Sequence, residues 1–307
     1  MNTLKFVLSL TTKENDYQRE QAAAAEDASR RVAANLQIIY ADNDAINQSQ
    51  QLLKIIQAPE STRPNAIIFE PVGTGLPQVA RAAASAGIGW VVLNRDVDYI
   101  SELRRGRRAP MFAVSSDHDE VGRIQGRQIE AMVPNGGYVL YIQGPASSSA
   151  ALQRTSGMSQ TKPSNVQVRM LKGQWTEESA ENAVASWLRL STSREVPIDI
   201  VVAQDDAMAI GARRALVEQA NPADRDRWSR VPFTGCDGMP ETGLAWVKSG
   251  LLAATVHVPA NAGTAIEMLA EAIATGVQPP ERSLTVPKSY PTIEALASKY
   301  RYAGAAR

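Results

Sequence analysis

The chain has 307 residues, which is more than one hydrophobic core usually organises, so the length predicts two domains. Its 32 Lys and Arg balance 32 Asp and Glu, and this zero formal charge argues against a basic surface for nucleic acid or membranes. Apolar residues make up 44% of the chain, enough for a packed interior, and no stretch approaches the roughly 20 apolar residues of a membrane span.

The few cysteines and histidines limit the chemistry further. A single cysteine, Cys236, excludes an intrachain disulfide, and two histidines, His118 and His257, are too far apart for a zinc site defined by spacing. We therefore expect no bound metal and no cofactor. The apolar run at residues 4–10 is too short for a secretory signal, so we expect either a cytoplasmic protein or one whose signal peptide has been removed.

Short β-branched runs alternate with longer Ala-rich amphipathic segments, a pattern typical of a parallel sheet with crossover helices. In the first half, the pattern predicts strands at 5–10, 37–40, 66–69 and 89–93. It predicts helices over about 16–35 and 76–86, and another that follows the capping cluster at 42–44 and extends to residue 56.

The second half repeats the scheme. Strands are predicted at 138–143, 167–171, 198–203 and 232–236, and helices near 119–132, 176–190, 207–220 and 240–248. Because residues 159–162 are polar and Pro163 cannot continue a helix, we expect only a short helix or a loop after Arg154. A helix over 260–275 and a short helix with a frayed end over 292–307 complete the chain.

Polar side chains follow most of the predicted strands. Ligands of open α/β sheets bind beyond the carboxyl ends of the strands, so these residues are the candidate site. These residues suit a small polyol. Their carboxylates, amides and guanidinium groups can hydrogen-bond adjacent hydroxyls, and their aromatic rings can cover C–H faces. The residues are Glu14, Asn15, Asp16 and Tyr17, then Asn94, Arg95 and Asp96, then Arg154, Trp175, Gln204, Asp205, Asp206, Asp237 and Gly238.

Three segments of the second half carry a resemblance to a known family. Residues 202–212 (VAQDDAMAIGA), 235–238 (GCDG) and 252–256 (LAATV) are similar to the type I periplasmic sugar-binding proteins of ABC transporters, of the ribose-binding type. The resemblance extends from the first strand to about residue 287. It implies an α/β fold of two Rossmann-like lobes, each a parallel sheet flanked by helices, joined by a three-segment hinge.

The resemblance also implies domain boundaries. Segments 111–116, 257–259 and 284–287 could carry the chain between the lobes. We therefore expect an N-terminal lobe of residues 1–112 plus 259–285, and a C-terminal lobe of residues 113–258 plus 286–307.

By position, the resemblance places sugar contacts on residues of both halves. They are Glu14, Asp16, Tyr17, Asn94 and Arg95 in the first lobe, and Arg154, Trp175, Asp205 and Asp237 in the second, with His257 at the hinge. The first loop of the ribose type has two phenylalanines, whereas this chain has one aromatic residue there, Tyr17, so one ring that could stack on the sugar is missing. Asn94, Asp205 and His257 replace Asp, Asn and Gln, so a sugar other than ribose is expected.

The charges of this set predict the character of the ligand. Glu14, Asp16, Asp205 and Asp237 outnumber Arg95 and Arg154 by about two if all are ionised. Because unpaired buried charge is costly, we expect a neutral or amine-bearing sugar and not an acidic or phosphorylated one.

Several residues have a simpler structural interpretation. Arg95 and Arg154 could form ordinary ion pairs, Trp175 could lie at the edge of a core, and His257 could pack at the hinge. We expect Asp206 to cap the helix that follows it. We expect the arginine-rich run 104–108 to be a solvated loop and not a nucleic-acid patch. We expect the acidic residues of 117–120 to supply charge at the start of the next helix and not to form a metal site.

The resemblance implies a monomeric, periplasmic solute-binding protein that captures a small sugar or polyol by hinge closure. It would present the sugar to an ABC transporter permease, would catalyse no reaction and would bind no nucleic acid. One alternative is a sugar sensor, either a repressor-type effector core or a receptor-docking protein. The other is a sugar- or nucleotide-processing enzyme, for which the loops supply carboxylates but no convincing catalytic set.

Overall fold

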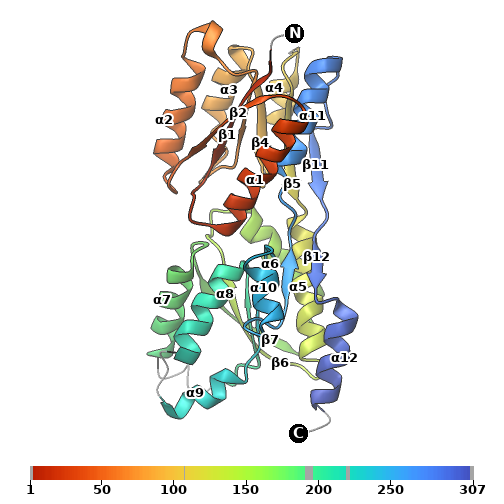
Figure 1. Cartoon of the computed structure of the whole chain (residues 1–307). Coiled ribbons are helices and arrows are strands. Elements are labelled where there is room, and N and C mark those ends of the chain that lie inside the picture. Colours follow the sequence, from red (N-terminus) through yellow and green to blue (C-terminus); the bar gives the residue numbers. More distant parts are fainter. Residues whose placement is uncertain (1–2, 107, 191–195, 219–221, 305–307) are drawn as a thin grey trace. The chain divides into compact units, whose positions relative to one another are not determined.

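The computed structural model of the protein describes residues 3–106, 108–190, 196–218 and 222–304. The chain divides into two compact units, which we call unit 1 (Met1–Ser116 and Ala260–Thr285) and unit 2 (Asp117–Pro259 and Val286–Arg307). It therefore passes from one unit to the other three times, and each unit contains segments that are far apart in the sequence (Figure 1).

Unit 1 is built on a six-stranded sheet in which every neighbouring pair is parallel. The strand order is β11 (Arg282–Thr285), β5 (Met111–Ser116), β4 (Gly89–Leu93), β3 (Ala66–Phe69), β1 (Lys5–Leu10) and β2 (Asn35–Tyr40). The helices are α1 (Asp16–Arg31), α2 (Ala45–Ile56), α3 (Pro77–Ser85), α4 (Ile100–Arg104) and α11 (Ala262–Thr275), with a short 3-10 turn at Glu60–Thr62.

Alternate residues of these strands enter two separate cores, because successive side chains of a strand point to opposite faces. Phe6 and Leu8 pack with α1 and α11, whereas Val7 packs with α2, α3 and α4. Both faces are therefore covered, as the nearly uninterrupted apolar strands predict for a parallel sheet. Figure 1 shows α1 and α11 on one side of this sheet and α2 and α3 on the other.

Unit 2, like unit 1, has helices on both faces of a parallel sheet, and its sheet is smaller. The parallel order is β7 (Val166–Lys172), β6 (Gly137–Gln143), β8 (Ile200–Ala203) and β9 (Phe233–Thr234), and β10 (Thr255–His257) pairs antiparallel with β12 (Lys288–Tyr290). The helices are α5 (His118–Met132), α6 (Ser149–Thr161), α7 (Glu177–Leu188), α8 (Asp206–Arg213), α9 (Pro222–Ser229), α10 (Gly243–Lys248) and α12 (Ile293–Gly304). A π-helical turn, Arg214–Glu218, follows α8.

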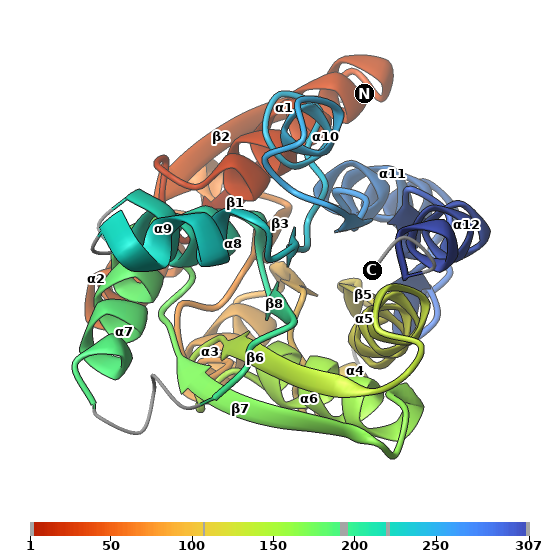
Figure 2. The same cartoon turned by 90° about the horizontal axis from the view of Figure 1, so that it is seen from below.

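The two faces of this sheet are also covered separately. Leu140 and Val201 pack with α7 and α8, whereas Val139 and Ile200 pack with α5, α6 and α12. α12 lies beside α5, as both views show (Figure 1, Figure 2). No helix among the described residues is long and apolar enough to cross a membrane.

The predicted α/β class with two parallel sheets is confirmed, and the strands at 5–10, 66–69 and 89–93 have the predicted bounds. The short strands β10, β11 and β12 and the helix α9 were not predicted. The predicted helix over 207–220 ends at residue 213 with the π-helical turn beyond it, and its last two residues lie outside the described chain. Residues 305–307 of the predicted tail also lie outside it.

Of the two expectations after Arg154, a short helix or a loop, the structure has the helix: α6 continues to Thr161, ends before Pro163 and places Arg154 in its interior. Its polar sequence is stabilised by tertiary contact with α5, which outweighs weak local propensity. The helices approach so closely that a side chain on Gly122 would overlap the Arg154 carbonyl oxygen, and one on Gly157 would overlap that of Asp119. The hydroxyl of Thr161, the last residue of α6, donates to the carbonyl oxygen of Arg123 in α5 at 3.1 Å.

We predict that Gly157→Ala destabilises the protein by about 1–3 kcal/mol, because the new methyl group must separate the two backbones. Helix propensity alone predicts the opposite effect, an increase of up to about 1 kcal/mol in the free energy of unfolding. The free energy from urea unfolding therefore distinguishes the two effects.

Gly73→Ala is the matched control. A methyl group there meets only the Cβ of Ala45, at 3.7 Å, which is ordinary contact. This variant should stay within about 0.5 kcal/mol of the wild type. A Gly157→Ala protein as stable as the control would contradict the proposed helix contact.

Candidate functional site

The carboxyl ends of the unit 1 strands carry a buried polar network centred on Glu70. This carboxylate follows β3 directly and is 4% exposed. Its Oε2 accepts hydrogen bonds from Gln18 Nε2 at 3.0 Å and Asn94 Nδ2 at 3.2 Å, and its Oε1 lies 3.7 Å from Arg95 Nη1. Glu70 therefore joins the start of α1 to the end of β4 and balances the charge of Arg95.

Asn94 is held on every side within unit 1. Its Nδ2 donates to the Tyr17 hydroxyl at 3.0 Å as well as to Glu70, and its Oδ1 accepts from the Ser116 N–H at 3.3 Å and from Asn261 Nδ2 at 2.6 Å. An amide side chain has two donor hydrogens and two acceptor lone pairs, so these four bonds use its full capacity. In this structure Asn94 positions its neighbours, and a direct bond to a ligand would require one of the four to break.

The first loop contributes unequally to this network. Tyr17 is buried and reaches Asn94 through its hydroxyl. Asp16 instead forms an ion pair with Arg19 on the same helix, and Glu14 is exposed. The structure thus brings Tyr17, Asn94 and Arg95 together, and it does not join Glu14 or Asp16 to them.

In unit 2 the corresponding feature is the guanidinium of Arg154, whose side chain is 6% exposed. Its Nη1 donates to the Gln204 carbonyl oxygen, and its Nη2 lies 3.5 Å from Asp237 Oδ1. The group also lies 5.6 Å from the centre of the Trp175 ring, within the range of a cation–π contact. Three predicted residues, Arg154, Trp175 and Asp237, therefore surround one buried cation.

The two aspartates at the start of α8 have different roles, and the expectation that Asp206 caps the helix is wrong. Asp205 is the cap, since its Oδ1 accepts from the Met208 N–H at 2.6 Å. The oxygens of Asp206 accept from the Gly238 N–H in the loop after β9 and from the hydroxyl of Thr255 on β10, both at 2.7 Å. Asp206 thereby fixes the loop that carries Asp237.

Burial perturbs both carboxyl groups. It raises the pKa of Asp205 to about 6, although the Met208 hydrogen bond and the Arg154 charge act in the opposite direction. Burial and the nearby charge of Asp237 raise the pKa of Asp206 well above its usual range. The second oxygen of Asp205 is buried without a hydrogen-bond partner among the described residues, which leaves an acceptor able to bind a donor from a ligand.

Three of the predicted residues have a left-handed backbone, with φ of 55° at Asn94, 62° at Trp175 and 102° at Asp237. This region is costly for residues other than glycine, and most of all for a bulky residue such as tryptophan. Strained residues of this kind concentrate at ligand sites, where surrounding contacts hold them. Ala33, Asp42, Asn43 and Leu76 share this conformation outside the polar networks, so what distinguishes Asn94, Trp175 and Asp237 is that strain and polar contacts coincide there.

His257 lies on β10 beside the loop that carries Asp237. An isolated parallel bridge pairs the two residues, and His257 Nδ1 donates to the Gly238 carbonyl oxygen at 2.9 Å. The imidazole is half-buried at the end of this strand. It therefore supports the Asp237 loop and keeps part of its ring accessible.

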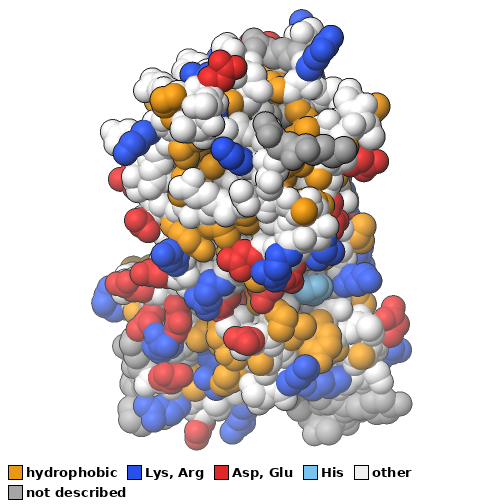
Figure 3. All heavy atoms as spheres, turned by 45° about the horizontal axis from the view of Figure 1, so that its top comes forward, with side chains coloured by type: hydrophobic (Ala, Val, Ile, Leu, Met, Phe, Trp, Pro, Cys, Tyr) orange, Lys and Arg blue, Asp and Glu red, His pale blue; other side chains and the backbone are white. Residues whose placement is uncertain are grey.

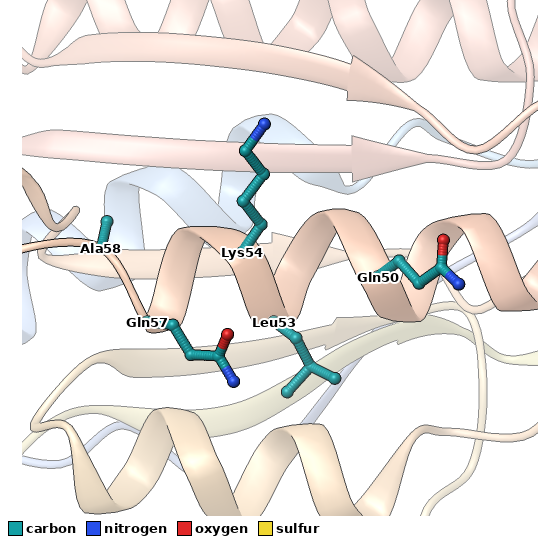
Figure 4. A pocket seen from close by; sticks show the side chains of 5 residues that line it. All are labelled: Gln50, Leu53, Lys54, Gln57 and Ala58. Atoms are coloured by element: carbon teal, nitrogen blue, oxygen red, sulfur yellow. The ribbon is translucent and has the colours of Figure 1, made fainter.

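Other features of the surface do not define a competing site. One open hollow lies along the C-terminal half of α2, which leads to the amino end of β3, away from the polar network (Figure 4). A second hollow in unit 1 is formed by the loops after β3 and β4, on the same edge as Glu70 and Arg95, and includes Asp96 and Tyr99. Among the described residues, no three His, Cys, Asp or Glu side chains are grouped to hold a metal ion.

The surface charge agrees with the neutral composition. On the face shown in Figure 3, Lys and Arg side chains are interspersed with Asp and Glu. Within the basic run, Arg104 donates to the carbonyl oxygens of Met111 and Pro279, so it joins neighbouring segments of unit 1.

Sequence reasoning missed four polar residues of these two networks. Glu70 could have been found, because it directly follows a predicted strand, as the selected residues do. Gln18 shows its role only once α1 is placed against β3. Asn261 and His118 contact Asn94 and Arg154 across 167 and 36 residues of chain, and no local pattern marks such pairs.

The fold and the strand-end polar groups together define a two-unit α/β protein with a candidate small-molecule site in each unit. Residues 6–277 match the periplasmic binding protein domain, and the chain belongs to this family. The xylitol-binding protein of Mycolicibacterium smegmatis is 29% identical over 71% of this chain and 58% of its own length. The D-allose-binding periplasmic protein of Escherichia coli is 24% identical over 89% and 85% of the two chains.

Solved structures agree on the fold. The solute-binding protein of an ABC transporter from Actinobacillus succinogenes, solved with bound D-allose, has a TM-score of 0.80 over 96% of this chain and all of its own, at 21% identity. The chain spans less than two thirds of the length of the xylitol-binding relative.

The raised pKa of Asp205 predicts how stability depends on pH. Since the folded group titrates at about 6 and the unfolded group at about 3.9, the folded chain binds the extra proton between these values and loses stability as pH rises through them. Asp205→Asn retains a capping oxygen and cannot ionise. We expect it to exceed the wild type at pH 7.5 by up to about 3 kcal/mol in the free energy of unfolding, and to lose this advantage near pH 4.

Asp44→Asn is the control, because Asp44 caps α2 in the same way but is exposed. Its effect should stay within about 0.5 kcal/mol throughout the same pH series. A difference between Asp205→Asn and wild type that is independent of pH would show that Asp205 carries no burial cost.

Proposed function

We propose that the protein is the solute-binding component of an ABC importer and captures one small sugar or polyol between its two units. The observation that carries the proposal is the pair of polar clusters, each with a strained backbone residue, formed by Tyr17, Glu70, Asn94 and Arg95 in unit 1 and by Arg154, Trp175 and Asp237 in unit 2. Family membership and relatives that bind xylitol and D-allose support it. The proposal includes an extracytoplasmic location, a permease partner and no catalysis.

The groups available suit hydroxylated ligands. A guanidinium offers paired donors, carboxylates offer paired acceptors, and each combination spans adjacent hydroxyl groups of a sugar. Tyr17 and Trp175 supply aromatic surface for C–H faces. Asp205 offers a buried oxygen that has no hydrogen-bond partner in the described part of the chain, and this oxygen gains most from a hydroxyl or ammonium donor.

Binding would act through closure of the two units. A ligand that contacts both units in a closed form and one unit in an open form favours closure by its difference in affinity. The chain crosses between the units after Ser116, Pro259 and Thr285, and these three crossings would serve as the hinge. The permease would then recognise the closed form.

The first test is a thermal-shift screen of sugars, polyols and amino sugars, since a ligand bound only by the folded state raises the melting temperature. Arg95→Ala and Asp237→Ala, one in each unit, should each abolish the shift. Their unliganded melting temperatures should change by only a few degrees, because about 1 kcal/mol moves a large domain by about 2–4 °C.

Arg81→Ala and Asp226→Ala are matched controls. Arg81 forms an exposed ion pair with Glu102 in unit 1, and Asp226 is exposed on α9 in unit 2. Both variants should retain the full shift. Retention of the shift by Arg95→Ala and Asp237→Ala as well would refute the proposed site.

The charge of the clusters predicts the class of sugar. Arg95 is balanced by Glu70, whereas Arg154 faces both Asp237 and Asp205. Calorimetric titration should therefore detect neutral or amine-bearing sugars, and sugar acids and sugar phosphates should bind at least about 100-fold more weakly because they add unpaired negative charge. Tight binding of a sugar phosphate with no uptake of neutral sugars is the contrary result.

A further inference from the structure

We propose that His118 is a positioning residue for the sugar site: its unprotonated Nδ1 accepts a hydrogen bond from Arg154 Nε and sets the plane of the guanidinium. The contact is 3.4 Å long and joins the first residue of α5 to the middle of α6. This inference rests on the proposed function, because Arg154 matters here as a group that binds sugar.

The geometry leaves one tautomer for His118. Arginine only donates hydrogen bonds, so the imidazole nitrogen facing Arg154 Nε must be the acceptor, and the ring hydrogen is on Nε2. His257 must adopt the opposite form, because its Nδ1 faces the Gly238 carbonyl oxygen, which only accepts. The two histidines of the chain therefore carry their hydrogens on different nitrogens.

The surroundings of His118 favour its neutral form. The imidazole is 4% exposed, which penalises a charge, and the neighbouring guanidinium is already positive. Its place at the N-terminus of α5 adds the positive end of the helix dipole. A neutral acceptor also avoids a further negative charge beside Asp205 and Asp237.

His118 and the Gln204 carbonyl oxygen together determine the orientation of Arg154. They bind Nε and Nη1, and fixing two of the three nitrogens fixes the planar group. The third nitrogen then points toward Asp237 Oδ1, and Cζ lies 5.6 Å from the centre of the Trp175 ring. The close contacts at Gly122 and Gly157 hold α5 and α6 at the spacing that this bond needs.

The contact can be tested without any ligand, by ¹⁵N spectra of the imidazole nitrogens of the labelled full chain at pH 8. We expect His118 to have protonated Nε2 and bare Nδ1, and His257 to have protonated Nδ1, with signals assigned by His257→Gln. Arg154→Met should shift the Nδ1 signal of His118 and leave His257 unchanged. A hydrogen on His118 Nδ1, or no response to Arg154→Met, would overturn the inference.

The functional arm uses calorimetry with xylitol, D-xylose, D-allose and myo-inositol. For each probe that wild type binds, His118→Ala should weaken binding by about tenfold, the scale of one hydrogen bond to a charged group. His118→Asn, whose Oδ1 occupies nearly the position of Nδ1 and cannot ionise, should stay within about threefold of wild type. Equal binding by all three proteins, or equal loss in both variants, would overturn the positioning role.

The two arms separate the two proposals. If wild type binds none of the four probes, the proposed function fails for these sugars, and the spectra still decide the His118–Arg154 contact. If wild type binds but the tautomers are reversed, the proposed function stands and the role of His118 does not.

Discussion

The parallel arrangement of the strands is the constraint from which the candidate site follows. Every strand of a parallel sheet ends at the same edge, and the following helices begin there, so polar loops converge without any long excursion of the chain. In unit 1 this edge brings Glu70 after β3, Asn94 after β4 and Ser116 at the end of β5 within hydrogen-bond reach. Asn261, from a segment that returns much later, completes the same cluster.

The clusters carry a cost to stability that a purely structural role does not require. Asp205 and Asp206 are buried with raised pKa values, and Asn94 in unit 1 and Trp175 and Asp237 in unit 2 occupy a strained backbone region. Such features persist only where surrounding contacts enforce them, and ligand sites are where they usually occur. The two hydrogen bonds that Asp206 accepts from Gly238 and Thr255 enforce the strained turn at Asp237.

Much of the fold could be predicted because apolar strand runs and capping residues are local signals. β1, β3 and β4 were identified to the residue, since each is a short apolar run with polar or glycine boundaries. The choice between helix and loop after Arg154 could not be made from the sequence, because the stability of α6 comes from backbone contact at Gly122 and Gly157, which depends on where α5 lies. The sequence did not show which of the two aspartates caps α8. Asp205 caps the helix because Asp206 binds the loop at Gly238, and that contact depends on the tertiary structure.

The candidate site, like the fold, could be predicted only in part. Tyr17, Asn94, Arg95, Trp175 and Asp237 lie in or just after loops that follow strands, as the pattern predicts, Arg154 lies inside the helix that follows β6, and the structure joins the six into two clusters. Their partners Gln18, His118 and Asn261 have no such signal, because each contributes through a contact with a distant segment. Asp16 fits the pattern but pairs within its own helix, which a strand-end rule cannot detect.

The charges of the two clusters differ, and the difference bears on what they can bind. In unit 1 Glu70 and Arg95 neutralise each other, so that cluster offers hydrogen bonds with little net field. In unit 2 one guanidinium faces Asp205 and Asp237, while Asp206 lies near Asp237, and burial raises the pKa of Asp205 and Asp206, which relieves the excess negative charge. A hydroxyl or ammonium donor can satisfy the Asp205 oxygen that no described residue binds, whereas an anionic ligand would compete with these carboxylates for Arg154. A neutral acceptor at His118 is compatible with these charges, because it orients the Arg154 guanidinium without neutralising its positive charge.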